Sequence, residues 1–239
     1  MKTAFKFKKE DKVVVLTGAG ISAESGLKTF RDNDGLWENH RVEEVATPQA
    51  FQSDPRLVWK FYKLRYFQLS EVKPNPGHFA LKKLEDYSGK NFFIITQNVD
   101  GLHQQAGNER VLEMHGSIRN CFCIKCNTKY KMKDIDLYPE IPICEKCRGA
   151  VRPDVVWFGE IPYFLNEIDE IIKKADYFLV VGTSGVVYPA AQFLYIAKMR
   201  GAKTIGVNLE APENRKFIDE FHQGKSGELL PELVEKWIG

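Results

Sequence analysis

Short apolar runs alternate along this chain with longer segments whose apolar residues recur at helical spacing. The runs of strand length lie at residues 12–20, 92–95, 111–114, 152–160, 177–181, 203–207 and 217–221. The helical segments lie at residues 54–70, 75–87, 166–175, 190–200 and 227–238. This alternation predicts an α/β fold built on a doubly wound parallel sheet, with a cysteine-rich module inserted after about the fourth core strand.

Residues 54–70 carry the start signals of a helix, because Asp54 and Pro55 are typical of a helix N-terminus. One side of this helix is traced by Leu57, Phe61, Leu64 and Gln68. Tyr62 and Arg65 are three residues apart and share another side, where a phenol and a guanidinium could hold one carboxylate. The residues alone favour the alternative, an aromatic packing face with a solvated arginine beside it.

Polar residues follow two of the predicted strands at the points where they end. Gln97, Asn98 and Asp100 come directly after one run, and His115 follows the next. In an open parallel sheet, ligands bind outside the carboxyl ends of the strands, so these side chains are placed for chemistry. The alternative is a polar turn followed by a hydrogen-bonded histidine, and this stretch alone does not decide between the two.

The first predicted strand runs into a glycine turn. Gly18, Gly20 and Ala23 fit the pattern G-x-G-x-x-A, in which glycines let the backbone approach a pyrophosphate at a helix start. Residues 29–40 look like a loop and lack the strand-end acidic residue of an ordinary dehydrogenase. Asn208 and Glu210 could supply the ribose contact instead, although Glu210 could equally begin a helix ahead of Pro212.

Composition excludes several classes of protein. The 239 residues are 44% hydrophobic, enough for a sizeable core, and 34 Lys plus Arg against 32 Asp plus Glu leave a net charge of only +2. Nothing in this balance favours nucleic acid or a membrane surface. The early apolar run is too short for a signal peptide or a membrane span. We therefore expect a soluble, cytoplasmic protein with one large domain or one large domain and a small one.

Four of the five cysteines form two C-x-x-C pairs whose separation is typical of a zinc ribbon. The pairs are Cys123 with Cys126 and Cys144 with Cys147. Four thiolates fill a tetrahedral zinc ion and leave no position for water, so the expected metal is structural. Cys121 is then a partly buried free thiol. Because no basic and aromatic residues interleave here, a nucleic-acid-binding ribbon is the weaker alternative.

Together these motifs resemble those of the sirtuins, which are NAD-dependent protein-lysine deacylases. The matching motifs are GAGIS (18–22), TFR (29–31), TQNVDGLH (96–103), LEMHGS (112–117), both cysteine pairs, FGE (158–160), GTS (182–184), VYPA (187–190) and NLE (208–210). The run Leu27, Lys28, Thr29, together with Tyr62 and Arg65, is similar to the class III branch, whose members remove acidic acyl groups such as succinyl. Gly185 departs from the family, which usually has a bulkier residue there.

The resemblance implies a Rossmann-like large domain at residues 1–116 and 154–239 and a zinc module at 117–153, with helices of residues 27–75 contributing to the small domain. It implies one structural zinc ion held by the four paired cysteines. Residues implied to bind NAD are Gly18, Ala19, Gly20, Ile21, Glu24, Phe30, Arg31, Trp37, Gln97, Asn98, Asp100, Gly182, Thr183, Ser184, Asn208, Leu209, Glu210 and Ser226. Substrate contacts are implied for Tyr62, Arg65, Phe158, Gly159, Glu160 and Val186.

The activity implied by the resemblance is removal of acetyl groups, and also of succinyl or malonyl groups, from lysine. Nicotinamide leaves as the acyl oxygen attacks the ribose, and His115 is the general base on a ribose hydroxyl, with Asn98 positioning the ribose and water. The products are nicotinamide and O-acyl-ADP-ribose. The implied partners are acyl-lysine proteins or peptides, and we expect a monomer. The alternatives are a mono-ADP-ribosyltransferase and a non-catalytic NAD-sensing or zinc-ribbon binding module.

Overall fold

A six-stranded, wholly parallel sheet forms the centre of the larger lobe. The computed structural model of the chain describes residues 5–27, 36–37 and 40–239. Its main sheet has the order β11-β10-β9-β1-β4-β5. The strands are β1 (Val13–Thr17), β4 (Phe92–Thr96), β5 (Val111–Glu113), β9 (Tyr177–Val181), β10 (Lys203–Asn208) and β11 (Glu220–Gln223). The predicted α/β class is confirmed, and near-continuous apolar strands such as VVVLT suit a sheet covered on both faces.

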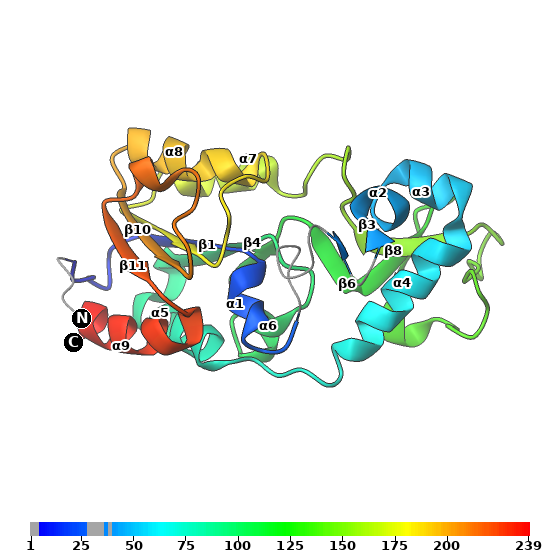
Figure 1. Cartoon of the computed structure of the whole chain (residues 1–239), viewed down its shortest axis with the longest axis horizontal. Helices are drawn as coiled ribbons and strands as arrows, with labels where there is room; N and C mark the ends of the chain where they lie inside the picture. Colours follow the sequence, from blue (N-terminus) through cyan, green and yellow to red (C-terminus); the bar gives the residue numbers. More distant parts are fainter. Residues whose placement is uncertain (1–4, 28–35, 38–39) are drawn as a thin grey trace.

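Two pairs of helices cover the two faces of this sheet (Figure 1). On one face α5 (Pro76–Ser88) packs beside α9 (Ser226–Ile238), and both join a hydrophobic cluster with the sheet. On the opposite face lie α7 (Leu165–Ile172) and α8 (Ala190–Met199) over a second cluster. The described N-terminal segment returns to α9, where the backbone N–H of Phe7 donates to Trp237 O.

The smaller lobe holds a three-stranded antiparallel sheet in the order β7-β6-β8 (Figure 1). Its elements are β6 (Gly116–Cys123), β7 (Lys129–Lys131), the 3-10 turn Met132–Asp134, β8 (Val151–Val155), and the helices α2 (Val42–Val45), α3 (Pro48–Ser53) and α4 (Pro55–Gln68). Strands β2 (Leu36–Trp37) and β3 (His40–Arg41) form a short ribbon. One hydrophobic cluster unites α4 with β6 and β8, so residues distant in sequence share one core. The module follows the third strand of the main sheet along the chain, not the fourth.

The side of α4 traced by Leu57, Phe61, Leu64 and Gln68 is only partly buried. Phe61 is buried but Leu64 is 57% exposed, whereas Tyr62 and Arg65 are buried. Periodicity does not single out one side, because the apolar residues are spread around the whole helix. The burial of Arg65 also excludes the alternative of a solvated arginine at this position.

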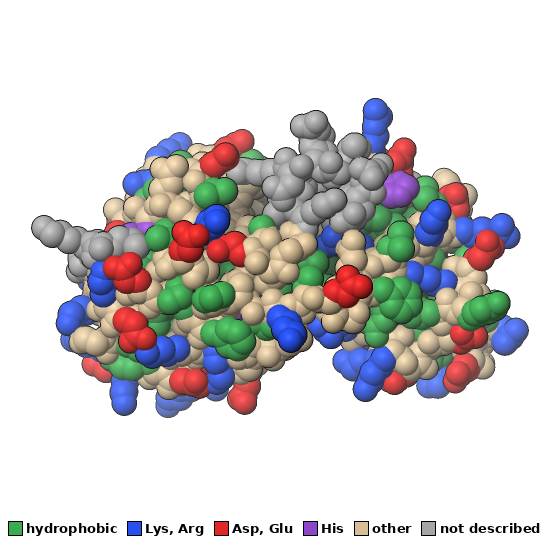
Figure 2. Space-filling model, turned by 60° about the horizontal axis from the view of Figure 1, so that its bottom comes forward, with side chains coloured by type: hydrophobic (Ala, Val, Ile, Leu, Met, Phe, Trp, Pro, Cys, Tyr) green, Lys and Arg blue, Asp and Glu red, His purple; other side chains and the backbone are tan. Residues whose placement is uncertain are grey.

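The last strand begins later than predicted. Residues Arg215–Phe217 form a 3-10 turn, and the strand itself is β11 (Glu220–Gln223). Phe217 and Phe221 still pack against the cluster under α8, which explains the apolar run that suggested a strand. In the part of the chain that the structure describes, no helix has the length and apolar character needed to span a membrane. Figure 2 shows both signs of charge interspersed over the face that it presents.

Candidate functional site

The glycine turn packs directly against the loop after β9, at the carboxyl edge of the sheet. The turn leads into α1 (Ala19–Ala23), and the backbone N–H of Gly20 donates to Gly182 O at 2.8 Å. A Cβ atom on Gly20 would lie 2.8 Å from Gly182 Cα, and one on Gly182 would lie 2.3 Å from Ile21 N. Both glycines are therefore required by this close approach of two backbone segments.

A buried hydrogen-bond network joins α1 to the polar segment after β4. Asn98 Nδ2 donates to Gly18 O at 3.0 Å and to Ser22 Oγ at 3.1 Å, and Ser22 Oγ donates to Asp100 Oδ2 at 2.8 Å. Burial raises the pKa of Asp100, and the backbone N–H of Leu102 and the Ser22 hydroxyl counteract this effect. The structure thus brings Asn98 and Asp100 together, and adds Ser22, which the motif GAGIS contained but which had no predicted role.

His115 lies at the end of β5 with its tautomer set by one hydrogen bond. Its Nδ1 is 3.1 Å from the carbonyl oxygen of Gln97. A carbonyl oxygen only accepts, so Nδ1 carries the proton and Nε2 keeps a lone pair. Burial lowers the pKa of His115, and the bond to Gln97 O opposes the shift. The neutral imidazole is therefore available as a base at neutral pH.

The segments after β9 and β10 complete the same edge of the sheet. Gln97 Nε2 donates to Thr183 Oγ1 at 3.1 Å, and Asn208 Nδ2 donates to Thr183 O at 2.7 Å. Glu210 does not begin a helix, since the next helical residues are the 3-10 turn Arg215–Phe217. Ser184 is half-buried and Leu209 is 61% exposed. Polar groups that follow β4, β5, β9 and β10 thus lie along one edge of the sheet.

Several of the predicted NAD-binding residues are engaged within the protein. The side chain of Ile21 is fully buried, so only its backbone could face a ligand, whereas Ala19 is exposed. Glu24 Oε1 accepts from the backbone N–H of Gly227 at 2.8 Å, next to the buried Ser226 at the start of α9. Phe30 and Arg31 lie outside the described residues. Trp37 is placed only by its backbone, in β2.

Tyr62 and Arg65 lie in the core of the smaller lobe, on the side of α4 that packs on the segment after β8. Tyr62 is fully buried, and its hydroxyl accepts a hydrogen bond of 3.0 Å from Trp157 Nε1. Burial raises the pKa of Tyr62 strongly, while the Trp157 bond and the charges of Arg152 and Arg65 act in the opposite direction. The phenol is therefore protonated at neutral pH, and it shares its surroundings with a guanidinium.

Residues 158–160 form a turn after β8, and the side chain of Glu160 makes its contacts within the protein. Glu160 forms an ion pair with Arg152 at 2.6 Å and accepts from the backbone N–H of Trp157 at 2.8 Å. The carboxylate of Glu160 is therefore engaged within the protein, and its predicted substrate contact stays a prediction that its backbone could meet. Phe158 is 52% exposed and Val186 is 43% exposed. Gly159 has a positive φ of 91°.

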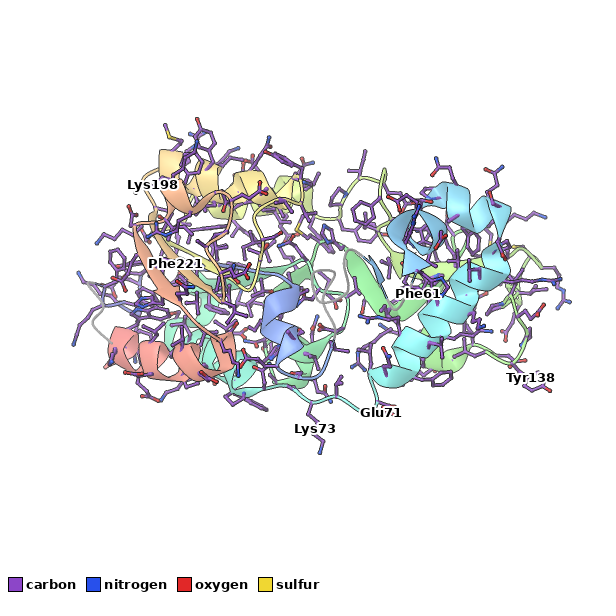
Figure 3. All side chains as sticks on the ribbon, viewed as in Figure 1. Phe61, Glu71, Lys73, Tyr138, Lys198 and Phe221 are labelled. Carbon is purple, nitrogen blue, oxygen red and sulfur yellow. The ribbon has the colours of Figure 1, made fainter. Side chains whose placement is uncertain are left out.

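The four paired cysteines converge at the far end of the smaller lobe. Their sulfur atoms all lie within 4.8 Å of one another, with Cys123 Sγ 3.4 Å from Cys147 Sγ and Cys126 Sγ 3.6 Å from Cys144 Sγ. A zinc ion with four Zn–S bonds of about 2.3 Å needs sulfurs about 3.8 Å apart, so the cluster fits a structural zinc ion. Cys121 is outside this cluster and fully buried. Figure 3 shows Tyr138, from the loop between the pairs, pointing away from the lobe.

Comparison with known proteins gives consistent matches over most of the chain. A model of the Sir2 family matches residues 18–189. A relative from Pyrococcus furiosus named NAD-dependent protein deacylase is 49% identical over 235 residues, which is 95% of this chain and 94% of the relative. A Sir2 homologue in complex with NAD has a TM-score of 0.88 at 42% identity, covering 95% of this chain and 90% of that one. Sir2 with a p53 peptide and NAD+ has a TM-score of 0.84 at 33% identity, covering 94% and 92%.

Proposed function

The chain belongs to the Sir2 family, and from this membership and the geometry of its site we infer that it is an NAD-dependent protein deacylase acting on acyl-lysine. The observation that carries the assignment is His115, a neutral imidazole whose Nε2 is left as a proton acceptor at the sheet edge beside the Asn98–Asp100 network. A zinc ribbon that only binds a partner has no need of such a base.

NAD fits the polar edge of the main sheet. The Gly18–Gly20 turn and Thr183 would hold the pyrophosphate, Asn208 and Glu210 would hold the adenosine ribose, and Ser226 would be near the adenine. This fit is supported by the close packing of the glycine turn on the loop after β9, which brings Thr183 beside Gly18. NAD supplies a ribose carbon from which nicotinamide departs. The buried Asp100, fixed by Ser22 Oγ and Leu102 N, is the group that we place beside nicotinamide.

The residues of this chain then carry the proton transfers and the positioning. His115 Nε2 takes the proton of a ribose hydroxyl, and the resulting positive charge on the ring is shared with Gln97 O through Nδ1–H. Asn98 has both amide hydrogens engaged, by Gly18 O and Ser22 Oγ, so its carbonyl oxygen is the atom that can orient ribose or water.

The acyl-lysine substrate is a protein or a peptide, as in the solved complex of Sir2 with a p53 peptide. Residues 158–160 and Val186 present partly exposed backbone that suits binding of an extended peptide by strand addition. We place the distal end of the acyl group at Tyr62 and Arg65, so that succinyl and malonyl groups are accepted as well as acetyl. Five cysteines, four of them in two C-x-x-C pairs, suit a reducing compartment better than a disulfide framework, which supports a cytoplasmic location.

The assignment is tested by incubating the protein with NAD and either an acetyl-lysine or a succinyl-lysine peptide, with mass detection of the products. We expect deacylated peptide, nicotinamide and O-acyl-ADP-ribose in equal amounts. ADP-ribose attached to protein would indicate a mono-ADP-ribosyltransferase instead. No product from either peptide would refute the deacylase assignment.

The pH dependence of turnover is expected to reflect the lowered pKa of His115. Because only the neutral imidazole accepts a proton, kcat/KM should fall as the pH drops through the pKa of His115, which burial places below its usual value of 6.5. Initial rates on one peptide between about pH 5 and pH 8 locate this midpoint. A midpoint above 6.5 would contradict the tautomer and burial deduced for this residue.

Replacing Arg65 with methionine is expected to change the preference between acyl groups. Loss of one charged hydrogen bond of about 2 kcal/mol should lower kcat/KM for succinyl-lysine roughly 30-fold. The acetyl group has no carboxylate to lose, so kcat/KM for acetyl-lysine should fall far less. Arg56→Met is the matched control, since Arg56 is on the same helix but its ion pair with Glu140 is exposed. Equal losses on both substrates would indicate that Arg65 only packs.

A further inference from the structure

His103 ends the motif TQNVDGLH, and the deacylase mechanism gives it no part. It lies in α6 (Leu102–Gln105), close after Asp100, and it is 1% exposed. Its Nε2 is 3.0 Å from Thr17 Oγ1, at the end of β1. Burial lowers the pKa of His103 well below its usual value of 6.5, so the ring is neutral and carries a single N–H.

The hydroxyl of Thr17 fixes which ring nitrogen of His103 carries that hydrogen. Thr17 Oγ1 donates its one hydrogen to Thr96 Oγ1, at 2.8 Å on the neighbouring strand β4. Toward His103 it can therefore only accept, so Nε2 is protonated and Nδ1 keeps a lone pair. This tautomer is opposite to that of His115, in which Nδ1 carries the proton.

Thr96 continues this chain of hydrogen bonds to the carboxyl edge of the sheet. Besides the hydrogen of Thr17, its Oγ1 accepts the backbone N–H of Asn98 at 3.1 Å. Thr17 is fully buried and Thr96 is 2% exposed, so bulk water does not compete for these bonds. The backbone of Asn98 is thus held by a hydroxyl group whose orientation depends on Thr17 and His103.

His78, in the first turn of α5, faces the remaining nitrogen of His103. Its Nδ1 accepts from the backbone N–H of Asn75 at 3.3 Å, and burial lowers its pKa to about 4, so Nε2 carries the hydrogen. The two ring centres are 5.0 Å apart. His78 Nε2 and His103 Nδ1 are buried, and neither has a hydrogen-bond partner in the part of the chain that the structure describes. One is a donor and the other an acceptor, so a direct bond or one bridging water can join them.

We propose that His103 is a positioning residue for Asn98: through two buried hydroxyl groups it fixes the direction of the hydrogen bond that holds the Asn98 backbone at the carboxyl edge of the sheet. The hydroxyl groups are those of Thr17 and Thr96, and His78 supports the far side of the imidazole. The proposal rests on the deacylase function, in which the side-chain oxygen of Asn98 orients ribose or water. It extends that function to residues too deeply buried to contact a substrate.

The tautomers are measured by nuclear magnetic resonance on the isotope-labelled, folded protein, through couplings between the carbon-bound ring hydrogens and the ring nitrogens. At about pH 7.5, where the imidazoles are neutral, we expect Nε2–H in His78 and His103 and Nδ1–H in His115. His115 is the internal reference, because its partner is a carbonyl oxygen. A hydrogen on Nδ1 of His103 would reverse the chain of hydrogen bonds and overturn the proposal.

Two substitutions that keep side-chain shape test the role in turnover. Thr17→Val deletes the hydroxyl group, and His103→Phe deletes the N–H donor. We expect each to lower kcat for O-acyl-ADP-ribose formation about tenfold, the factor for one hydrogen bond, and the double variant to be no slower than either. KM for NAD should change less than about twofold, because the groups proposed to hold the pyrophosphate and the adenosine ribose are unaltered.

A conservative replacement and a matched control separate positioning from packing. His103→Gln places an amide N–H where Nε2 was and should restore most of kcat. Equal kcat in His103→Gln and His103→Phe would show that the ring only packs. Thr204→Val is the matched control, because Thr204 is fully buried near the opposite end of β10 and its hydroxyl donates to Phe217 O at 2.7 Å. It should lower Tm and leave kcat unchanged.

Failure of this proposal and failure of the proposed function give different results. If the unaltered protein forms O-acyl-ADP-ribose but Thr17→Val and His103→Phe keep kcat within about twofold, the positioning role is refuted and the deacylase function stands. If the unaltered protein forms no O-acyl-ADP-ribose, the function fails and the positioning role fails with it. If His103→Phe does not fold, Thr17→Val and the tautomer of His103 decide.

Discussion

His115→Ala is expected to lower the rate of O-acyl-ADP-ribose formation by about 10²- to 10⁴-fold, the range for loss of a general base. Alanine removes Nε2, and the neighbouring polar side chains at this edge of the described structure, Asn98 and Asp100, are already held by Gly18 O, Ser22 and Leu102 N. The measurement is product formation under saturating NAD and peptide, followed by mass detection.

The step at which activity is lost identifies the role of His115. In the proposed mechanism the base acts after nicotinamide has departed, so exchange of labelled nicotinamide into NAD should fall far less than product formation. His222→Asn is a matched control: this buried histidine is paired with Glu220 at 2.7 Å on the outer strand β11, away from His115. Equal loss of exchange and of product formation, with an unchanged melting temperature, would contradict the role of base.

Cys144→Ser is expected to abolish folding of the smaller lobe and the activity with it. Zinc binding contributes about 10–16 kcal/mol in zinc-finger peptides, comparable to the whole stability of a domain. Cys123 and Cys144 also belong to the hydrophobic cluster that contains Trp59 and Ile118, so loss of the metal propagates to α4 and β6. Removal of zinc by a strong chelator should have the same effect.

Metal analysis and far-ultraviolet circular dichroism check this expectation. We expect one zinc ion per chain in the unaltered protein and less than one in Cys144→Ser. Cys121→Ala is the matched control, because Cys121 is equally buried in β6 and lies outside the four-sulfur cluster. It should retain full zinc content. A folded, active protein without metal would contradict a structural zinc ion.

The sequence predicted the helix starts whose capping residues are unambiguous. Asp54 caps α4 through Leu57 N, as its position before Pro55 suggested. Asn75 and His78 form a reciprocal capping box at the start of α5, which accounts for a histidine with no catalytic part. The sequence did less well in α4, where apolar residues are spread around the whole helix, because periodicity then does not show which side is buried.

The sequence by itself determined the parallel sheet, the polar strand ends and the four zinc-ligand candidates, because each depends on residue type and short spacing. The tertiary structure alone decided which partners these groups have. The tautomer of His115 depends on Gln97 O, eighteen residues away, and the hydroxyl of Tyr62 accepts a hydrogen bond from Trp157, which follows a strand far along the chain. Such contacts form only when the chain has folded into its two lobes, because a hydrogen bond requires both atoms to be in place. No periodicity in the sequence encodes that geometry.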